Sequence, residues 1–271
     1  MKLQLFLIVV FAAFISCAPR AEVSDDEGVQ DRILNGDLAE AAKYPFIVNV
    51  QERKPGEKDP FRFCGASILS EKWLLTAAHC YDHVKSTADI RINAGVVDAN
   101  NFGSKSQEIS VKKWFIHPKY SRIAVHDDIA LIELLKPLKF NKHVSPISLP
   151  PADYEPTGEG KILGWGAIDP KEEIRSQYLR EATIHVSTEA ECNKHDSPMS
   201  AATQICLGVS DKTTACQGDS GGPFMQMINN KPCIVGVTSF AGKGCTEKAP
   251  SVYTKVSAYK SWIEETMKNN P

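Results

Sequence analysis

From Tyr44 onward, short apolar runs alternate with polar segments that are rich in turn-forming residues. Six such runs lie in the first half of the chain, at Phe46–Val50, Phe63–Leu69, Trp73–Thr76, Ile90–Val97, Ile109–Phe115 and Ile129–Leu134. Gly, Pro, Asn and charged residues gather between them, for example in Lys54–Pro60 and Asp98–Ser106. Short strands at this spacing are typical of an antiparallel barrel or sandwich.

A second set of runs follows the proline-rich connector Lys136–Pro151. These runs lie at Lys161–Trp165, Glu181–Val186, Gln204–Leu207, Pro223–Met227, Cys233–Phe240 and Ser251–Lys255. From Ser257 the period changes, because Tyr259, Trp262, Ile263, Thr266 and Met267 recur at helical spacing, with Ser257 as a candidate N-cap. The pattern predicts an all-β protein in two halves with a C-terminal helix.

The N-terminal residues follow a different pattern. Lys2 precedes the apolar run Leu3–Ile15, which is shorter than a typical membrane span and is typical of a signal peptide. We place this peptide at residues 1–17, with its end between 16 and 18. Residues 18–32 are polar and acidic and have too little apolar content to fold alone. We expect a pro-segment there, and a secreted, extracellular protein with disulfide bonds.

Charge and cysteine content narrow the function classes. The 271 residues carry a formal net charge of −2, which argues against nucleic acid or an anionic membrane as the main partner. The eight cysteines lie at positions 17, 64, 80, 192, 206, 216, 233 and 245, and their spacing alone does not define the pairing. No cluster of Cys and His has the spacing of a zinc site.

Three separate segments carry candidate catalytic groups. Three glycines and a proline surround Ser220, which predicts a tight, exposed turn. A serine hydroxyl is a weak nucleophile and needs a positioned base. His79 follows an apolar run and two alanines, which let its ring lie close to another surface. Asp128 opens an apolar run, and a His N–H would satisfy its partly buried carboxylate.

Together these segments resemble a known family. The motifs T-A-A-H-C around His79, D-I-A-L from Asp128 and G-D-S-G-G-P around Ser220 occur in this order, as in the chymotrypsin/trypsin family of secreted serine proteases. The resemblance extends from about Ile33 to the C-terminus. It implies two packed antiparallel Greek-key β-barrels, at about 44–135 and 155–255, and a helix at about 257–268, within a protease domain at 33–271.

The resemblance also implies a mechanism. Ser220 would attack the peptide carbonyl, His79 would accept and return the proton, and Asp128 would orient His79. The backbone N–H groups of Gly218 and Ser220 would form the oxyanion hole, where one donor contributes about 3 kcal/mol in the transition state.

Activation by cleavage is a further implication. Arg32–Ile33 stands where the family is cut after a basic residue, with Leu34 and Asn35 replacing the usual second and third residues of the new end. The ammonium of Ile33 would then pair with Asp219, because a buried carboxylate without a partner is costly. We therefore expect a zymogen and an activating trypsin-like protease.

The family's specificity pocket maps to five positions. Thr214 would form a neutral floor, which leaves a substrate Lys or Arg without a counter-charge. Ala241 and Ser251 would form the walls beside Ser239, and Phe240 replaces the usual Trp. We expect a chymotrypsin/elastase-like preference for Leu, Met, Phe and smaller aliphatic residues.

The resemblance implies the disulfides Cys64–Cys80, Cys192–Cys206 and Cys216–Cys245. Two alternatives remain for the other cysteines: Cys17 is lost with the signal peptide and Cys233 is a buried free thiol, or Cys17–Cys233 tethers the pro-segment. The family's calcium loop begins with Glu, where Val96 stands here, and Val offers no oxygen ligand. We expect no metal and no cofactor.

Two other classes of function fit the sequence less well. A catalytically silent homologue that acts as a binding or adaptor protein would usually lack Ser220, His79 or Asp128, and all three residue types are present. An α/β-hydrolase esterase requires the reverse order of these residues. The resemblance implies protein or peptide substrates, protein inhibitors of proteases as further partners, and a monomer.

Overall fold

The structure, a computed structural model, describes residues 36–53, 56, 61–169, 174–195, 199–242, 245–246 and 250–271. All of these residues belong to one unit, Asp31–Pro271. The expected signal peptide, the pro-segment and the Arg32–Ile33 bond lie outside the described residues.

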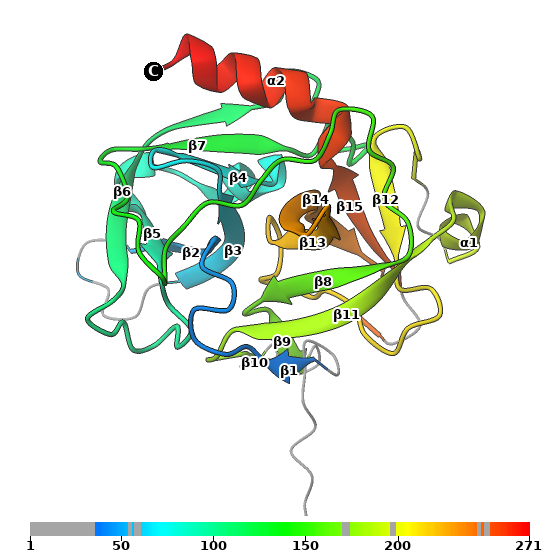
Figure 1. Cartoon of the computed structure of the whole chain (residues 1–271), viewed down its shortest axis with the longest axis horizontal. Coiled ribbons are helices and arrows are strands. Elements are labelled where there is room, and N and C mark those ends of the chain that lie inside the picture. Colours follow the sequence, from blue (N-terminus) through cyan, green and yellow to red (C-terminus); the bar gives the residue numbers. More distant parts are fainter. Residues whose placement is uncertain are drawn as a thin grey trace, which may run out of the picture. The chain divides into compact units, whose positions relative to one another are not determined.

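The first half of the unit is a closed barrel of six antiparallel strands (Figure 1). They run in the order β2 (Ile47–Glu52), β3 (Phe61–Ile68), β4 (Trp73–Thr76), β7 (Ala130–Leu134), β6 (Gln107–Ile116) and β5 (Ile90–Ala94). Every residue of β4 and β7 is buried. These short strands are mostly apolar, with Thr76 and Glu133 as the exceptions, and a candidate catalytic residue lies within three residues of one end of each strand.

The second half closes in the same way. Its strands run in the order β8 (Glu159–Gly164), β11 (Arg180–Ser187), β12 (Gln204–Leu207), β15 (Ser251–Lys255), β14 (Lys231–Ala241) and β13 (Pro223–Ile228). The ring closes because β8 pairs with both β11 and β13. Outside the ring, β1 (Asp37–Leu38) pairs with β11, and β9 (Ala167–Asp169) pairs with β10 (Ile174–Arg175). The prediction of two antiparallel barrels is confirmed.

The helices are few and short. The 3₁₀ helices η1 and η2 span Ala78–His83 and Thr87–Asp89, α1 spans Glu189–Asn193, and the C-terminal α2 spans Val256–Asn269. The predicted C-terminal helix is confirmed, but Ser257 is not its N-cap. Lys255 occupies that position, and the Ser257 hydroxyl, already inside the first turn, donates to the Tyr154 carbonyl at 2.8 Å.

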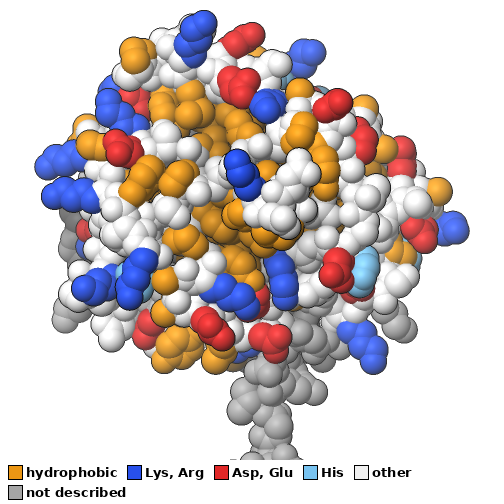
Figure 2. Space-filling model, viewed as in Figure 1, with side chains coloured by type: hydrophobic (Ala, Val, Ile, Leu, Met, Phe, Trp, Pro, Cys, Tyr) orange, Lys and Arg blue, Asp and Glu red, His pale blue; other side chains and the backbone are white. Residues whose placement is uncertain are grey.

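The surface carries both signs of charge. Lys and Arg side chains are interspersed with Asp and Glu over the face in Figure 2, in keeping with the small net charge. Among the described residues, no helix is both long and apolar enough to cross a membrane.

Candidate active site

Asp128 lies just before β7 and is completely buried. One carboxylate oxygen accepts a hydrogen bond from the His79 backbone N–H at 2.9 Å. The other lies 2.7 Å from His79 Nδ1 and accepts from the Ser239 hydroxyl at 2.5 Å. These three bonds offset the cost of burying the charge. Because Nδ1 faces the carboxylate, Nε2 is the ring nitrogen of His79 that remains for proton transfer.

Ser239 reaches Asp128 because its strand is irregular. The register of β14 against β15 shifts between Thr238 and Phe240, so Ser239 occupies a β-bulge. A bulge re-aims the side chain that it carries. The sequence placed Ser239 in the substrate pocket but gave no sign of its hydrogen bond to Asp128, since a bulge leaves no mark in the apolar pattern.

A short chain of bonds connects His79 to the turn that carries Ser220. Cys80 follows His79 and forms a disulfide with Cys64. Gly65 follows Cys64, and its N–H donates to the Ser220 carbonyl at 2.8 Å. The first barrel therefore presents its histidine directly against the serine turn of the second barrel.

Close packing at Gly221 fixes the same contact. A Cβ at this position would lie 2.2 Å from Oγ1 of Thr76, and the φ of Gly221 is +75°. Glycine alone fits this approach of the two barrels. The imidazole of His79 and the hydroxyl of Ser220 make no direct hydrogen bond in the part of the chain that the structure describes. Such bonds often tighten only when substrate is present.

The turn leaves two backbone donors unused. Within the described residues, the N–H groups of Gly218 and Ser220 donate to no acceptor, whereas those of Asp219 and Gly221 are bonded to carbonyl oxygens. The φ of Gly218 is +99°, a value that favours glycine. Since backbone donors are normally paired, two free ones beside Ser220 form a site for an oxyanion.

Asp219 lies beneath this turn with only 3% of its surface exposed. Its carboxylate accepts from the N–H of Gly166 at 2.8 Å and of Cys216 at 3.0 Å. Burial raises the pKa of Asp219 to about 6, although the two backbone donors and the charge of Arg175 oppose this rise. It makes no salt bridge to any described residue, so the buried carboxyl lacks a cationic hydrogen-bond partner.

A cavity of about 160 Å³ opens beside Ser220. The Ser220 turn and β14 line it, and the expected residues Ser239, Phe240 and Ala241 are among the lining. Thr214 and Ser251 are buried next to this lining: their hydroxyls bond to each other at 2.6 Å, and the Ser251 hydroxyl accepts from the N–H of the lining residue Ala215 at 3.1 Å. Their places as floor and wall of the pocket stay predictions. No charged residue is among the described lining.

The structure contains the three disulfides implied by the resemblance, Cys64–Cys80, Cys192–Cys206 and Cys216–Cys245. Cys233 is a buried free thiol whose pKa is raised by burial. The other half of the alternative Cys17–Cys233 bond, Cys17, lies outside the described residues. Ligand atoms of Cys64, His79 and Cys80 cluster, but the two sulfurs are bonded to each other and offer no thiolate to a metal.

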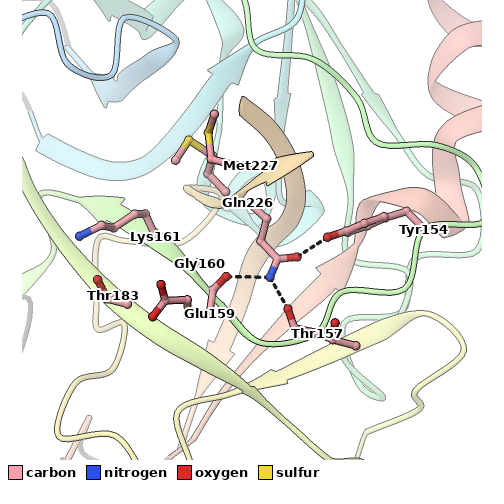
Figure 3. A pocket seen from close by; sticks show the side chains of 9 residues that line it. Tyr154, Thr157, Glu159, Gly160, Lys161, Thr183, Gln226 and Met227 are labelled. Atoms are coloured by element: carbon pink, nitrogen blue, oxygen red, sulfur yellow. Dashed lines mark hydrogen bonds between the residues drawn. The ribbon is translucent and has the colours of Figure 1, made fainter. Parts of the chain in front are cut away.

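A larger cavity of about 360 Å³ lies elsewhere, around Gln226 (Figure 3). The Gln226 amide nitrogen donates to the carbonyls of Thr157 at 2.7 Å and Glu159 at 2.9 Å. Its oxygen accepts from the Tyr154 hydroxyl at 3.0 Å. The amide thus braces β13 against the segment before β8, and no residue of the proposed triad lines this cavity.

Comparison with known proteins agrees with this geometry. A model of the protein family described as Trypsin matches residues 33–263. A human protein named "Putative trypsin-6" is 33% identical over 264 residues, which cover 97% of this chain and 98% of the human protein. The matched region contains both barrels and all three candidate catalytic residues. The chain therefore belongs to the trypsin family of serine endopeptidases.

Proposed function

We propose that this endopeptidase is secreted as a zymogen and cleaves after apolar residues through Ser220, His79 and Asp128. The observation that carries the proposal is the His79–Asp128 pair, held at 2.7 Å and joined through Cys64–Cys80 and Gly65 to the Ser220 turn. A base, its orienting acid and a nucleophile are thereby assembled from two barrels.

The chemistry runs in two halves. Ser220 attacks the substrate carbonyl while His79 Nε2 takes the hydroxyl proton, and the same proton then passes to the leaving amine. Water repeats the attack on the acyl-enzyme with His79 again as base. The Asp128 carboxylate accepts three hydrogen bonds and stabilises the imidazolium that forms in both halves.

The unused N–H groups of Gly218 and Ser220 would receive the negative charge on the substrate oxygen. Each such donor contributes about 3 kcal/mol to the transition state, since it bonds the oxyanion more strongly than the neutral carbonyl. The chemistry therefore needs the turn to hold this shape.

Activation would act on that turn through Asp219. Gly36 is anchored because its carbonyl accepts from Arg180 at 3.0 Å. Arg180 pairs with Gly164 on the next strand, and a Cβ at Gly164 would lie 2.0 Å from Oδ1 of Asp219. Adjacent strands lie about 4.8 Å apart and three extended residues reach about 10 Å. These contacts support the proposal that an Ile33 ammonium released by cleavage pairs with Asp219.

Pocket chemistry supports an apolar preference. The cavity beside Ser220 has an uncharged described lining in which Ala241 narrows one side and the Phe240 backbone continues the strand. Burying a substrate Lys or Arg there without a counter-charge is costly. Leu, Met and Phe, with smaller aliphatic residues, are the substrates that this lining favours.

Secretion, a trypsin-like activator, control by protein inhibitors and a monomeric state complete the proposal. Three disulfides support an oxidising compartment, and the basic Arg32 before Ile33 supports an activator that cuts after Arg. The apolar run Leu3–Ile15 supports export by a signal peptide.

A fluorophosphonate probe and a positional peptide library test the proposal. The protein, cleaved after Arg32, should be labelled covalently and should hydrolyse peptides with Leu, Met or Phe before the scissile bond. Ser220→Ala should fold and lose both activities. Labelling that persists in this variant would exclude Ser220 as nucleophile, and a dominant preference for Arg or Lys would refute the pocket assignment.

A further inference from the structure

Arg175, on the short strand β10, lies against the oxyanion turn. A Cβ built on Gly218 would be 3.5 Å from both Cδ and Nε of this arginine. The arginine also acts electrostatically on the neighbouring Asp219, whose pKa it lowers. Arg175 thus places a positive charge within a few ångströms of the atoms that would hold the scissile carbonyl.

An aromatic surface holds this guanidinium in place. Its carbon atom lies 4.8 Å from the centre of the Phe61 ring on β3, within the range of a cation–π contact. Phe61 in turn stacks on Phe63, with ring centres 6.4 Å apart and an interplanar angle of 11°. Phe61 is 52% exposed, so core packing does not account for this ring. An aromatic face and a guanidinium that are both within reach of solvent offer a ligand an apolar surface beside a positive charge.

The position of this pair relative to the cavity gives its role. The cavity that would take the side chain before the scissile bond is lined by β14 and the Ser220 turn. Neither Arg175 nor Phe61 is part of that lining. Phe61 belongs to β3, which contacts the turn from the first barrel through the Gly65 N–H bond to the Ser220 carbonyl, and Arg175 lies against Gly218. A substrate chain that continues past the scissile bond, away from the cavity, would run toward this pair.

We propose that Arg175, held on Phe61, forms a subsite for an acidic residue at one of the first two positions after the scissile bond. The inference rests on the proposed catalytic role of Ser220. A guanidinium has five N–H donors, so Arg175 can keep its existing contacts and still bind a carboxylate. The Phe61 ring would cover the methylene groups of a Glu side chain, and a Lys at the same position would be repelled.

Matched peptides measure this preference. Peptides share one apolar residue before the scissile bond, carry an amidated C-terminus, and have Glu, Gln or Lys at the first or the second following position. We expect kcat/KM to be about tenfold higher for Glu than for Lys at one of the two positions, because an attraction replaces a repulsion. This ratio should shrink as salt is raised.

Variants assign the preference to Arg175. Arg175→Gln should bring the Glu-to-Lys ratio close to one, Arg175→Lys should largely keep it, and Arg175→Glu should invert it. Lys268→Gln, which removes a positive charge from α2, should leave the ratio as it is in the wild type. An unchanged ratio in Arg175→Gln, or no Glu preference in the wild type, would overturn the inference. Absence of Ser220-dependent hydrolysis in the cleaved wild-type protein would instead refute the proposed function, so the two failures are distinguishable.

Discussion

The two halves of the active site differ in how completely their polar groups are paired. The Asp128 carboxylate accepts from the His79 N–H, the His79 ring and the Ser239 hydroxyl. In the turn around Ser220, two backbone N–H groups have no acceptor among the described residues, and the buried Asp219 carboxyl has backbone donors alone. The fold alone completes the hydrogen bonds of the His79–Asp128 pair. The Asp219 carboxyl beneath the oxyanion turn, in contrast, has no cationic hydrogen-bond partner among the described residues.

This difference supports the proposal that activity is controlled at the Ser220 turn and not at the His79–Asp128 pair. A fully bonded His–Asp pair has little to gain from a further contact. A buried carboxyl with a raised pKa gains substantially from an ammonium, since pairing relieves its desolvation. Cleavage at Arg32 should therefore change the turn and leave the His79–Asp128 pair as it is.

The largest expected effect comes from disrupting the bonded half. Asp128→Asn should lower kcat by about 10⁴-fold, the size known for this substitution in such a triad, because an amide favours the wrong imidazole tautomer. Asp127→Asn is a matched control, since Asp127 bonds to Tyr259 and His126. It should cost less than about tenfold. Equal losses in the two variants would contradict the role of Asp128.

Removing the proposed cleavage site at Arg32 tests the turn around Ser220. Arg32→Gln should give a stable protein whose peptide hydrolysis stays about 10³-fold below that of the activated enzyme, since without the Ile33 ammonium Asp219 would not hold the turn and its two donors in place. The active wild-type protein should begin at Ile33 by N-terminal sequencing. An active protein that begins upstream of Ile33 would disprove the switch.

The raised pKa of Asp219 predicts how the stability of the precursor depends on pH. The folded pKa of about 6 exceeds the value of 3.8 expected for an unperturbed carboxyl, so the folded state binds the proton more tightly. The free energy of unfolding should therefore be higher below pH 4 and fall as pH rises to 6, by about 3 kcal/mol from this group. Denaturant unfolding of the precursor measures it.

Two comparisons isolate this contribution. Asp219→Asn should flatten the slope between pH 4 and 6. The activated form should also lose less stability in this range, because the Ile33 ammonium lowers the pKa of Asp219. Pairing with Asp219 raises the pKa of the Ile33 amine. The stabilisation from this ion pair is therefore complete at neutral pH and is lost as the pH rises through the raised pKa of the amine. A slope that Asp219→Asn leaves unchanged would show that other groups cause it.

The smallest expected effect concerns the pocket. Ala241 lies two residues after Ser239 on β14, so it can change the wall without changing the base. Ala241→Gly should improve kcat/KM for Phe and Trp relative to Leu by about tenfold, since one methylene in a pocket is worth about 1–3 kcal/mol. As a control, titration of the active sites with an inhibitor should give the same fraction of competent enzyme in Ala241→Gly as in the wild type. No shift in preference would show that Ala241 does not limit the pocket.

The sequence predicted the strands whose buried side chains form a clear apolar run. The runs Trp73–Thr76, Gln204–Leu207 and Ser251–Lys255 match β4, β12 and β15 residue for residue. Strands β1, β9 and β10 have three residues or fewer and were missed, because so short a segment shows no period. Serine is a common N-cap residue, which is why Ser257 was expected to cap the C-terminal helix. Its hydroxyl instead donates to the carbonyl of Tyr154, in a distant loop.

In the site as well, local sequence motifs predict some residues, whereas contacts between distant segments could not be predicted. Motifs marked His79, Asp128 and Ser220, whose types and order are specific. Spacing from the nucleophile predicts Thr214 at the pocket floor, but it gives no sign of the bond between the hydroxyls of Thr214 and Ser251. The contact between Arg175 and Phe61 joins positions more than one hundred residues apart, so no local sequence pattern predicts it. Such pairings depend on the packing of the two barrels.

The rate at which a fluorophosphonate labels Ser220, before and after cleavage at Arg32, tests the central claim most directly. The reaction needs both the base and the oxyanion hole. If the fold assembles the first and Ile33 completes the second, labelling should be slow in the precursor, about 10²–10³-fold faster after cleavage, and slow throughout in Arg32→Gln. Equal rates before and after cleavage would contradict this account.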